Sequence, residues 1–351
     1  MLHQLMIRHI LKYLLNVSMI EHFLKEIREI YPGSPEKNNL ILFGLICLNK
    51  RFYSFSNMFV DYLMLNQKQS IYACTNLKGV LKKVYSMDID GEILNDISDL
   101  IKCDVLFLQN CNEINNVSAL KYCRYIFLRN CSNITNLSNL QKCHTLKISP
   151  GDDRIIDLGT LGNCKEIILI FFDEIKNISA LAKCHKVTLN NCNVTDITAL
   201  GKCYSVELYR CHLITDVSAL GKCYELYIEN CGGVIDVSKL GSCHNLSIIG
   251  CDNISDVTEL GKCHALRIEY CKNINDVSTL GNCNTLTIDI SFIDRGASNL
   301  LKCQKLYIIP GEDTRVHGTS WCGYGSTKIN NANEFIGIMK HFRGKNYDIY
   351  N

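Results

Sequence analysis

Cysteine is the residue of this chain best suited to do chemistry, with 21 copies among 351 residues. Thiolates ligate zinc and act as nucleophiles, so their spacing decides which chemistry is open to the chain. Most of the cysteines fall into two series that recur almost every twenty residues. The first series is Cys103, Cys123, Cys143, Cys164, Cys184, Cys203, Cys223, Cys243, Cys263, Cys283 and Cys303, and the second is Cys111, Cys131, Cys192, Cys211, Cys231, Cys251 and Cys271.

Four cysteines of the first series directly precede a histidine, which raises the possibility of a zinc site. The pairs are Cys143-His144, Cys184-His185, Cys243-His244 and Cys263-His264. Zinc needs four ligands that converge on one point at about 2.0–2.3 Å. In a repeat, the cysteine is expected to point into the core while its neighbour lies outside it or along a turn. We therefore expect no metal site.

Other catalytic patterns are missing from the sequence. It contains no Gly-rich phosphate loop, no G-x-S-x-G elbow and no H-E-x-x-H motif. A thiol buried in a ladder of identical thiols is inert. We expect no catalytic residue and no cofactor, and the chain is predicted not to be an enzyme.

The elements that position these cysteines follow from the residues around them. Leu226 and Ile228 are separated by one residue, the period of a strand that buries one face. Leu220 and Cys223 precede this pair at three-residue spacing, and Cys231 follows it. A fixed period of about twenty residues indicates a solenoid, in which no single unit can bury its own apolar face.

The resulting pattern, L-x-x-C-x-x-L-x-I-x-x-C, resembles the leucine-rich repeat, L-x-x-L-x-L-x-x-N/C-x-L, over about residues 84–310. The resemblance implies an α/β repeat fold: a solenoid of about eleven 20-residue repeats with short parallel strands. Because a repeat of this length leaves little room on the convex side, we expect 3₁₀ or single-turn pieces there. The second series of cysteines would occupy the inward Asn/Cys position and satisfy backbone groups of the loop.

The geometry of such a stack argues against disulfides. Equivalent side chains lie roughly 4.8 Å apart with parallel Cβ vectors, whereas a disulfide needs Cβ atoms that converge. Glycosylation sequons at Asn116, Asn136 and Asn177 fall on a recurring turn position, where a glycan would add bulk to a packed turn. Free thiols in a reducing compartment, the cytoplasm, are therefore predicted.

The turn residues of the repeat also carry expectations. Ser218 and Thr258 have the residue types and positions of caps for a single helical turn. Glycines such as Gly221 then follow at the end of that turn, where a positive φ would be convenient.

Four domains are expected along the chain. Residues 1–65 are predicted to form a small helical domain, and residues 66–95 the leading cap of the array. The repeats proper occupy residues 96–310. Residues 311–351 fall outside the pattern and form a trailing cap or tail, because the terminal units of a solenoid expose apolar edges.

The first domain resembles an F-box. The run Leu40–Ser56 is similar to the end of that motif, and Ile7–Leu14 to its first helix. This resemblance implies docking on the Skp subunit of an SCF-type ubiquitin ligase. The residues that would make the contact are Ile10, Leu11, Leu14, Leu48 and Phe52. The repeats and F-box-like segment together are similar to chains of amoeba-infecting giant viruses, which would place the protein in the host cytoplasm. The alternative is a plain helical cap.

The exposed side of the strands is the candidate binding surface. Residues between and beside each aliphatic pair should line a concave face, and aromatic residues with arginine are typical anchors of interfaces. The candidates are Phe107, Phe127, Ile168, Tyr209, Arg210, Tyr227, Glu229, Arg267, Glu269 and Tyr270. The alternative is that large side chains merely pave a sheet, since aromatic and β-branched residues suit strands anyway.

Composition narrows the classes of partner. Lys plus Arg number 37 and Asp plus Glu 35, so no basic excess favours nucleic acid. The longest charge-free apolar run, Leu40–Leu48, is too short to span a bilayer. We expect a monomer that binds protein partners on its concave face. It would act either as a substrate-recognition adaptor with Skp and cullin partners or as a stand-alone scaffold.

Overall fold

One continuous sheet organises the molecule. The computed structural model describes residues 63–65, 84–90, 96–101, 103–150, 158–175, 178–292, 295, 297–309, 327–329 and 334. Within them, fourteen strands follow one another in chain order, and every neighbouring pair is parallel except β13 and β14. The strands are β1 (Leu63–Leu65), β2 (Val84–Asp90), β3 (Val105–Gln109), β4 (Tyr125–Arg129), β5 (Thr145–Ser149), β6 (Glu166–Ile170), β7 (Lys186–Asn190), β8 (Ser205–Tyr209), β9 (Glu225–Glu229), β10 (Asn245–Ile249), β11 (Ala265–Glu269), β12 (Thr285–Asp289), β13 (Lys305–Ile309) and β14 (Thr327–Ile329).

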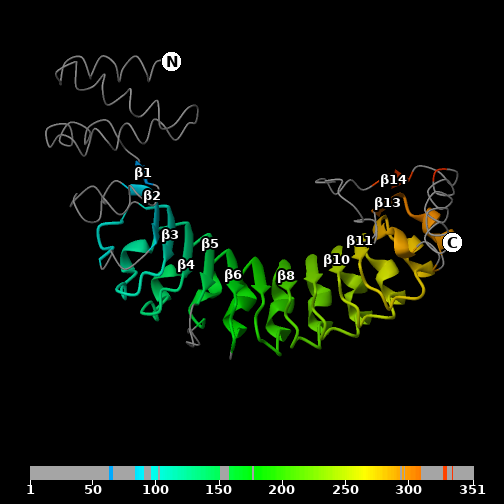
Figure 1. The fold of residues 1–351 in the computed structure, drawn as a ribbon, viewed down its shortest axis with the longest axis horizontal. Coiled ribbons are helices and arrows are strands. Elements are labelled where there is room, and N and C mark those ends of the chain that lie inside the picture. Colours follow the sequence, from blue (N-terminus) through cyan, green and yellow to red (C-terminus); the bar gives the residue numbers. More distant parts are fainter. Residues whose placement is uncertain are drawn as a thin grey trace, which may run out of the picture.

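Short 3₁₀ helices make the return connections, as the length of the repeat predicted. They are η2 (Ser118–Leu120), η3 (Ser138–Leu140), η4 (Leu161–Asn163), η5 (Ser179–Lys183), η6 (Thr198–Lys202), η7 (Ser218–Lys222), η8 (Ser238–Ser242), η9 (Thr258–Lys262), η10 (Ser278–Asn282), η11 (Ile290–Phe292) and η12 (Ala297–Lys302). The strands line the concave side of a shallow arc, and the 3₁₀ helices its convex side (Figure 1). The predicted solenoid of eleven short parallel strands is confirmed as β3–β13.

The register of the sheet is constant, so equivalent residues of successive repeats stand side by side. Leu226 of β9 pairs with Leu246 of β10, and Ile228 with Ile248. All four are buried, while Tyr227 between them is only half-buried. One face of the sheet is therefore the core, and the other face is exposed.

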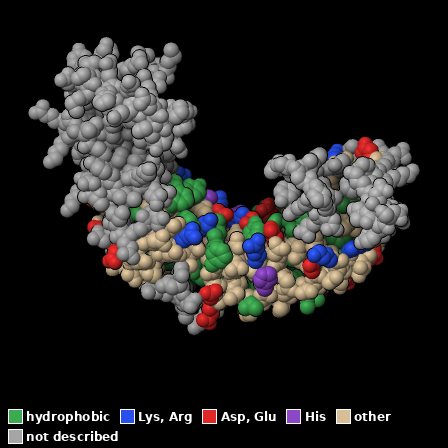
Figure 2. Space-filling view, in the orientation of Figure 1, with side chains coloured by type: hydrophobic (Ala, Val, Ile, Leu, Met, Phe, Trp, Pro, Cys, Tyr) green, Lys and Arg blue, Asp and Glu red, His purple; other side chains and the backbone are tan. Residues whose placement is uncertain are grey.

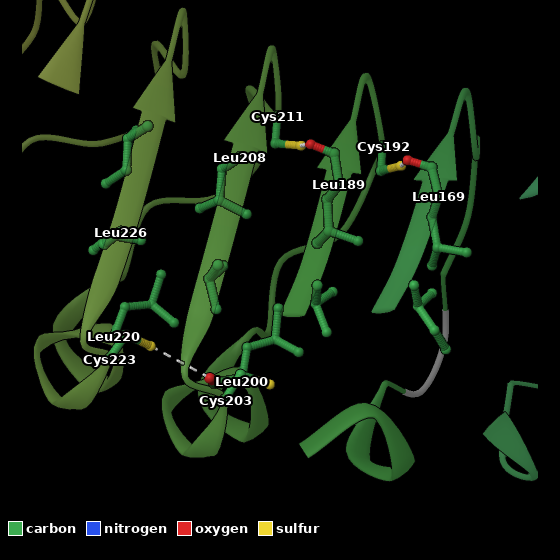
Figure 3. Packing of buried hydrophobic residues seen from close by; sticks show 14 of the residues in the cluster. Leu169, Leu189, Cys192, Leu200, Cys203, Leu208, Cys211, Leu220, Cys223 and Leu226 are labelled. Atoms are coloured by element: carbon green, nitrogen blue, oxygen red, sulfur yellow. Dashed lines mark hydrogen bonds between the residues drawn. The ribbon is translucent and has the colours of Figure 1, made fainter. Parts of the chain in front are cut away.

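Both series of cysteines lie in that core, and their thiols hold neighbouring repeats together. The Cys223 thiol donates to the carbonyl of Leu200 in the preceding repeat, at 3.6 Å. In the second series, Cys192 donates to the Leu169 carbonyl at 3.4 Å (Figure 3). The eighteen described cysteines are all free thiols, as the parallel geometry predicted. The inward cysteines donate mostly to strand carbonyls such as that of Leu169, and Sγ of Cys231 also accepts a hydrogen bond from the loop N–H of Cys211 at 3.4 Å, so the expected role of satisfying loop backbone groups is met only in part.

The caps of the 3₁₀ helices differ from the expectation. Ser218 is the first residue of η7, and the N-cap residue before it, Val217, supplies no side-chain capping bond. Instead, the backbone N–H of Ser218 donates to Oδ1 of Asp216 at 2.8 Å. The same bond joins Thr258 to Asp256 at 2.9 Å. The aspartate two residues earlier is thus the cap, because its short side chain reaches the N–H that the turn leaves unpaired.

The glycines also serve a purpose other than the one expected. Gly221 does not have a positive φ, and a Cβ atom placed on it would lie 2.1 Å from the backbone oxygen of Lys239 in the next repeat. Gly201, Gly241 and Gly261 meet the next repeat at 2.3 Å in the same way. Glycine is therefore needed here so that successive 3₁₀ helices can approach closely.

The ends of the array fall largely outside the described residues. β1 occupies the last three residues of the range 1–65 that was expected to be helical, and β2 lies in the expected leading cap. Both extend the sheet beyond the repeats. The F-box-like helices lie outside the described residues, as does most of the trailing cap or tail expected at residues 311–351, of which only β14 and Glu334 are described.

Candidate binding surface

The exposed face of the sheet is built from the first, third and fifth residues of each five-residue strand, because side chains alternate along a strand. The in-register pairing turns the middle position into a row along the arc. That row reads Phe107, Phe127, Lys147, Ile168, Thr188, Glu207, Tyr227, Ser247, Arg267, Thr287 and Tyr307. Figure 2 shows hydrophobic side chains (green) beside Lys and Arg side chains (blue) along the concave rim.

On strands β3 to β5 the face is aromatic and basic, and we call this part the aromatic zone. The rings of Phe107 and Phe127 meet edge to face, with centroids 6.1 Å apart and an interplanar angle of 81°. Nζ of Lys147 lies 4.7 Å from the Phe127 ring centroid, a cation–π contact. Phe107 remains 43% exposed. The aromatic zone therefore exposes an apolar surface to solvent, with positive charge next to it.

A bidentate ion pair lies beside the aromatic zone. Arg124 Nε donates to Asp104 Oδ1 at 2.7 Å, and Arg124 Nη2 to Asp104 Oδ2 at 2.6 Å. The same guanidinium lies 5.8 Å from the ring centroid of Tyr125. Asp104 is nearly buried, so the pair fixes the position of Tyr125 at the start of β4.

From β8 onward the face becomes acidic and tyrosine-rich, and we call the part on β8 to β12 the acidic zone. The rings of Tyr209 and Tyr227 lie 5.0 Å apart at 38°. The Tyr227 hydroxyl donates to Oε2 of Glu229 at 2.5 Å, and that of Tyr209 to Oε2 of Glu207 at 3.5 Å. Burial, together with the negative charges of Glu207 and Glu229, raises the pKa of Tyr209 to about 12. Burial and the hydrogen bond to Glu229 also raise the pKa of Tyr227, so both phenols stay protonated at neutral pH and act as hydrogen-bond donors.

A lysine on β7 organises the carboxylates on either side of it. Nζ of Lys186 lies 2.7 Å from Oε1 of Glu207 and 3.7 Å from Oε1 of Glu166. Thr188 donates a further hydrogen bond to Glu207 at 3.0 Å. Burial lowers the pKa of Lys186, but the bond and charge of Glu207 outweigh it and leave the pKa raised. Glu207 is thus held rigidly in the middle of the face.

The charge of the exposed face changes sign between the two zones. Strands β3 to β5 carry Arg129 and Lys147 on this face and no acidic residue. In the acidic zone three half-exposed carboxylates, Glu207, Glu225 and Glu229, face the single cation Arg267. Glu269 and Asp289 occupy the last positions of their strands but are buried. A partner that covers both zones must therefore change its own charge along its length.

The structure brings most of the predicted contact residues onto one face. Phe107, Phe127, Ile168, Tyr227 and Arg267 occupy the middle of their strands, and Tyr209, Glu229 and Glu269 the last position.

Three of the predicted residues stand apart from the others. Arg210 and Tyr270 follow the strand ends in the left-handed conformation, with φ of 52° and 55°. They therefore belong to the turns beyond the face. Glu269 is only 2% exposed and bonds to Nε of Arg267, so it positions that arginine. Ile10, Leu11, Leu14, Leu48 and Phe52 lie outside the described residues.

Sequence reasoning missed a column of stacked rings along the edge where the strands begin. His185, Tyr204, Tyr224, His244 and His264 stack in that order, with centroids 4.3–4.8 Å apart and interplanar angles of 11–17°. Each ring follows a cysteine of the first series. The sequence does contain a signal for this column, a His or Tyr that recurs directly after the cysteine at nearly constant spacing. The Cys-His pairs were interpreted only as possible zinc ligands.

In the described residues no three His, Cys, Asp or Glu side chains are grouped to hold a metal ion.

Comparison with known proteins bears on the fold. The chain matches no protein-family model and no curated protein sequence. Among solved structures, internalin InlF from Listeria monocytogenes is similar with a TM-score of 0.50 and 19% identity, over 82% of this chain and 91% of that one. The fold is a leucine-rich repeat solenoid.

Two further leucine-rich repeat structures are similar at lower scores. Internalin C2 from Listeria monocytogenes matches with a TM-score of 0.37 and 18% identity, over 57% of this chain and 91% of that one. The functional domain of InlJ from the same organism, described as including a cysteine ladder, matches with a TM-score of 0.43 and 14% identity, over 65% of this chain and 58% of that one.

Among the described residues of this solenoid, no helix has the length and apolar character that crossing a bilayer requires.

Proposed function

We propose that the leucine-rich repeats form a non-catalytic protein-binding module whose concave sheet face holds the partner. The observation that carries this proposal is the aromatic zone. Phe107 and Tyr125 are large, exposed and fixed in place by Phe127 and by the Arg124–Asp104 pair. Exposed apolar patches on soluble proteins mark interaction sites, and rigid aromatic residues are the usual anchors.

The two zones define the chemistry of the partner. An apolar or aromatic side chain would pack against Phe107 and Phe127. Basic side chains would meet the carboxylates of the acidic zone, where Tyr209 and Tyr227 can donate hydrogen bonds only if their carboxylate partners release them. We therefore infer an amphipathic protein segment with an apolar anchor at one end and a basic stretch toward the other.

The test compares two variants that each remove exposed aromatic surface. Phe107→Ala with Phe127→Ala removes it from the face, whereas Tyr122→Ala removes it from the edge, where Tyr122 is 73% exposed. Cross-linked complexes from cytosol are identified by mass spectrometry. Proteins that bind the wild type and Tyr122→Ala but not the double variant support the proposal. Partners that survive the double variant and are lost with Tyr122→Ala would place the binding site on the edge.

We propose further that the N-terminal segment connects the module to an SCF-type ubiquitin ligase through Skp, in the cytoplasm of a host cell. The support is the resemblance of residues 7–14 and 40–56 to an F-box, together with the free thiols of the described repeats. A target held on the concave face would then be presented for ubiquitination. The alternative is a stand-alone scaffold without a ligase connection.

Binding of purified Skp to the full chain, measured by calorimetry, separates these alternatives. Leu11→Asp with Leu14→Asp should abolish binding if the segment works as an F-box. Lys12→Asp is the matched control, since Lys12 interrupts the apolar pattern of the same expected helix. Circular dichroism checks that each variant folds. If the wild-type chain does not bind Skp, the scaffold alternative is favoured.

A further inference from the structure

The two long edges of the solenoid carry opposite charge, although the whole chain has a formal net charge of only +2. All repeat strands run in the same direction, so their starts share one edge and their ends share the other. We call the residues from the last position of each 3₁₀ helix to the next strand the strand-start edge. The residues between each strand and the next 3₁₀ helix form the strand-end edge.

The strand-start edge is basic. Nine of its described residues are cationic, against the single acid Asp104, which is paired with Arg124. The cations are Lys121, Arg124, Lys142, Lys165, Lys183, Lys202, Lys222, Lys262 and Lys302. Among the described residues, Lys183, Lys202 and Lys222 form no ion pair, so no described carboxylate neutralises their charge.

The strand-end edge is acidic. Its described residues include nine carboxylates against the cations Arg210 and Lys272. The carboxylates are Glu113, Asp173, Glu174, Asp196, Asp216, Asp236, Asp252, Asp256 and Asp276. The hydrogen bonds from Ser218 lower the pKa of Asp216, so this carboxylate is ionised at neutral pH. Its neighbours Asp196 and Asp236 repel it, which an external cation would relieve.

The spacing of the two rows identifies the partner that fits them. The acidic row supplies one aspartate in each of five successive repeats, from Asp196 to Asp276. The basic row supplies Lys183, Lys202, Lys222 and Lys262 with the same repeat period, interrupted once at Ser242. A partner for either row must carry opposite charges at the spacing and curvature of this solenoid. The opposite edge of a second copy of the chain meets that requirement.

Exposed apolar side chains on both edges add to this complementarity. Tyr204 and Tyr224 present the edges of their stacked rings on the strand-start edge. Leu213 and Ile235 are exposed on the strand-end edge, the latter by 63%. Lone surface ion pairs contribute little to association, whereas a row of them around buried apolar contacts gives both register and affinity.

We propose that copies of this chain associate side by side, with the strand-start edge of one against the strand-end edge of the next. This association is independent of the proposed function, because it leaves every concave face open on the same side of the stack. Since the two contacting surfaces differ, each bound copy still offers one free edge, and the stack can grow. This departs from the monomer expected from the sequence.

The test uses full-length chains with one edge neutralised. The basic-edge variant changes Lys183, Lys202, Lys222 and Lys262 to Gln. The acidic-edge variant changes Asp196, Asp216, Asp236 and Asp256 to Asn. Asparagine keeps the cap, because Asn116 and Asn136 already accept the same N–H bonds at 2.9 and 3.0 Å in their own repeats. A control variant changes Arg129, Lys147, Lys239 and Lys305, which lie on neither edge, to Gln.

Sedimentation velocity over a dilution series gives the readout in about 0.05 M and about 1 M NaCl, where the Debye length at the higher salt is about 3 Å. Wild type and control should form species larger than dimers at low salt, with an apparent dissociation constant that rises about tenfold or more at high salt. Each edge variant alone should remain monomeric. Their equimolar mixture should form dimers and nothing larger, since only one pair of complementary edges remains. A monomeric wild type at low salt, or edge variants that still associate alone, would overturn the proposal.

Discussion

The two faces of the sheet obey different rules. On the buried face, almost every repeat places the same apolar pair and the same thiols, as with Leu226, Ile228 and Cys223. On the exposed face the residue at one position changes from Phe107 to Lys147 to Tyr227 along the arc. The period of the sequence therefore encodes the fold, and the departures from the period encode what the surface can bind. Substitutions that separate the two faces test this division.

The largest loss of stability should come from a substitution on the buried face. Leu226→Ala removes a buried side chain that lies between Val206 and Leu246 of the adjacent strands, and we expect it to lower the free energy of unfolding by about 2–5 kcal/mol. Tyr227→Ala, one residue away on the exposed face, loses a ring contact and a surface hydrogen bond, for about 1 kcal/mol. Urea unfolding followed by far-ultraviolet circular dichroism measures both. Equal losses would mean that the exposed face is as important to the fold as the core.

A somewhat smaller effect is expected where the 3₁₀ helices touch. Gly221→Ala places a Cβ atom against the backbone oxygen of Lys239, which cannot move without shifting the next repeat, and should cost about 1–3 kcal/mol. Ala182 occupies the equivalent position of η5, so Ala182→Gly is the matched control. It should lose only about 0.5–1 kcal/mol, from the added freedom of the unfolded chain. If Gly221→Ala is no worse than this control, the close approach does not limit the fold.

The division between the faces also explains how far the sequence could predict the molecule. Constant features, such as the Leu226 and Ile228 alternation or the cysteine series, repeat often enough to identify strands, core and free thiols. The caps and the glycines were misassigned because Ser218 and Gly221 have ordinary local explanations, while their actual partners, Asp216 and Lys239, become visible only in space. The ring column and the burial of Glu269 likewise depend on how neighbouring repeats stack. The repeat period identifies which residues are equivalent, but it does not show which residues of a neighbouring repeat they contact.

The cysteines of the buried face should differ from one another in their reactivity toward alkylating reagents. Cys131 and Cys303 are only half-buried, unlike the other sixteen described cysteines. A hydrogen bond from Cys111 lowers the pKa of the Cys131 thiol, whereas burial raises that of Cys303 to about 11. Because the thiolate is the reactive form, Cys131 should be alkylated about tenfold or more faster at neutral pH.

Peptide mass spectrometry after timed treatment with iodoacetamide gives the order of modification among the described cysteines. Denaturation in urea should bring their rates together, which controls for local sequence. If Cys303 or a fully buried thiol such as Cys243 reacts first in the folded protein, the solenoid opens at a place other than the one its burial indicates.

The smallest effect on stability is expected from the aspartates that cap the 3₁₀ helices in the turns between the two faces. Hydrogen bonds from Ser218, Ser238 and Thr258 lower the pKa values of Asp216, Asp236 and Asp256. A carboxylate whose folded pKa is lowered stabilises the fold at pH values above its unfolded pKa of about 4, and the stabilisation is lost as the pH falls through the folded pKa. Changing these three residues to Asn keeps the acceptor oxygen and removes the titration. The urea midpoint of the triple variant should therefore fall less steeply than that of wild type between about pH 5 and pH 2.

Asp→Ala at the same positions removes the acceptor too, and should lower stability at every pH. If the Asn variant and wild type keep a constant difference down to pH 2, the ionised cap contributes no more than the neutral one, and the aspartates serve the strand-end edge alone.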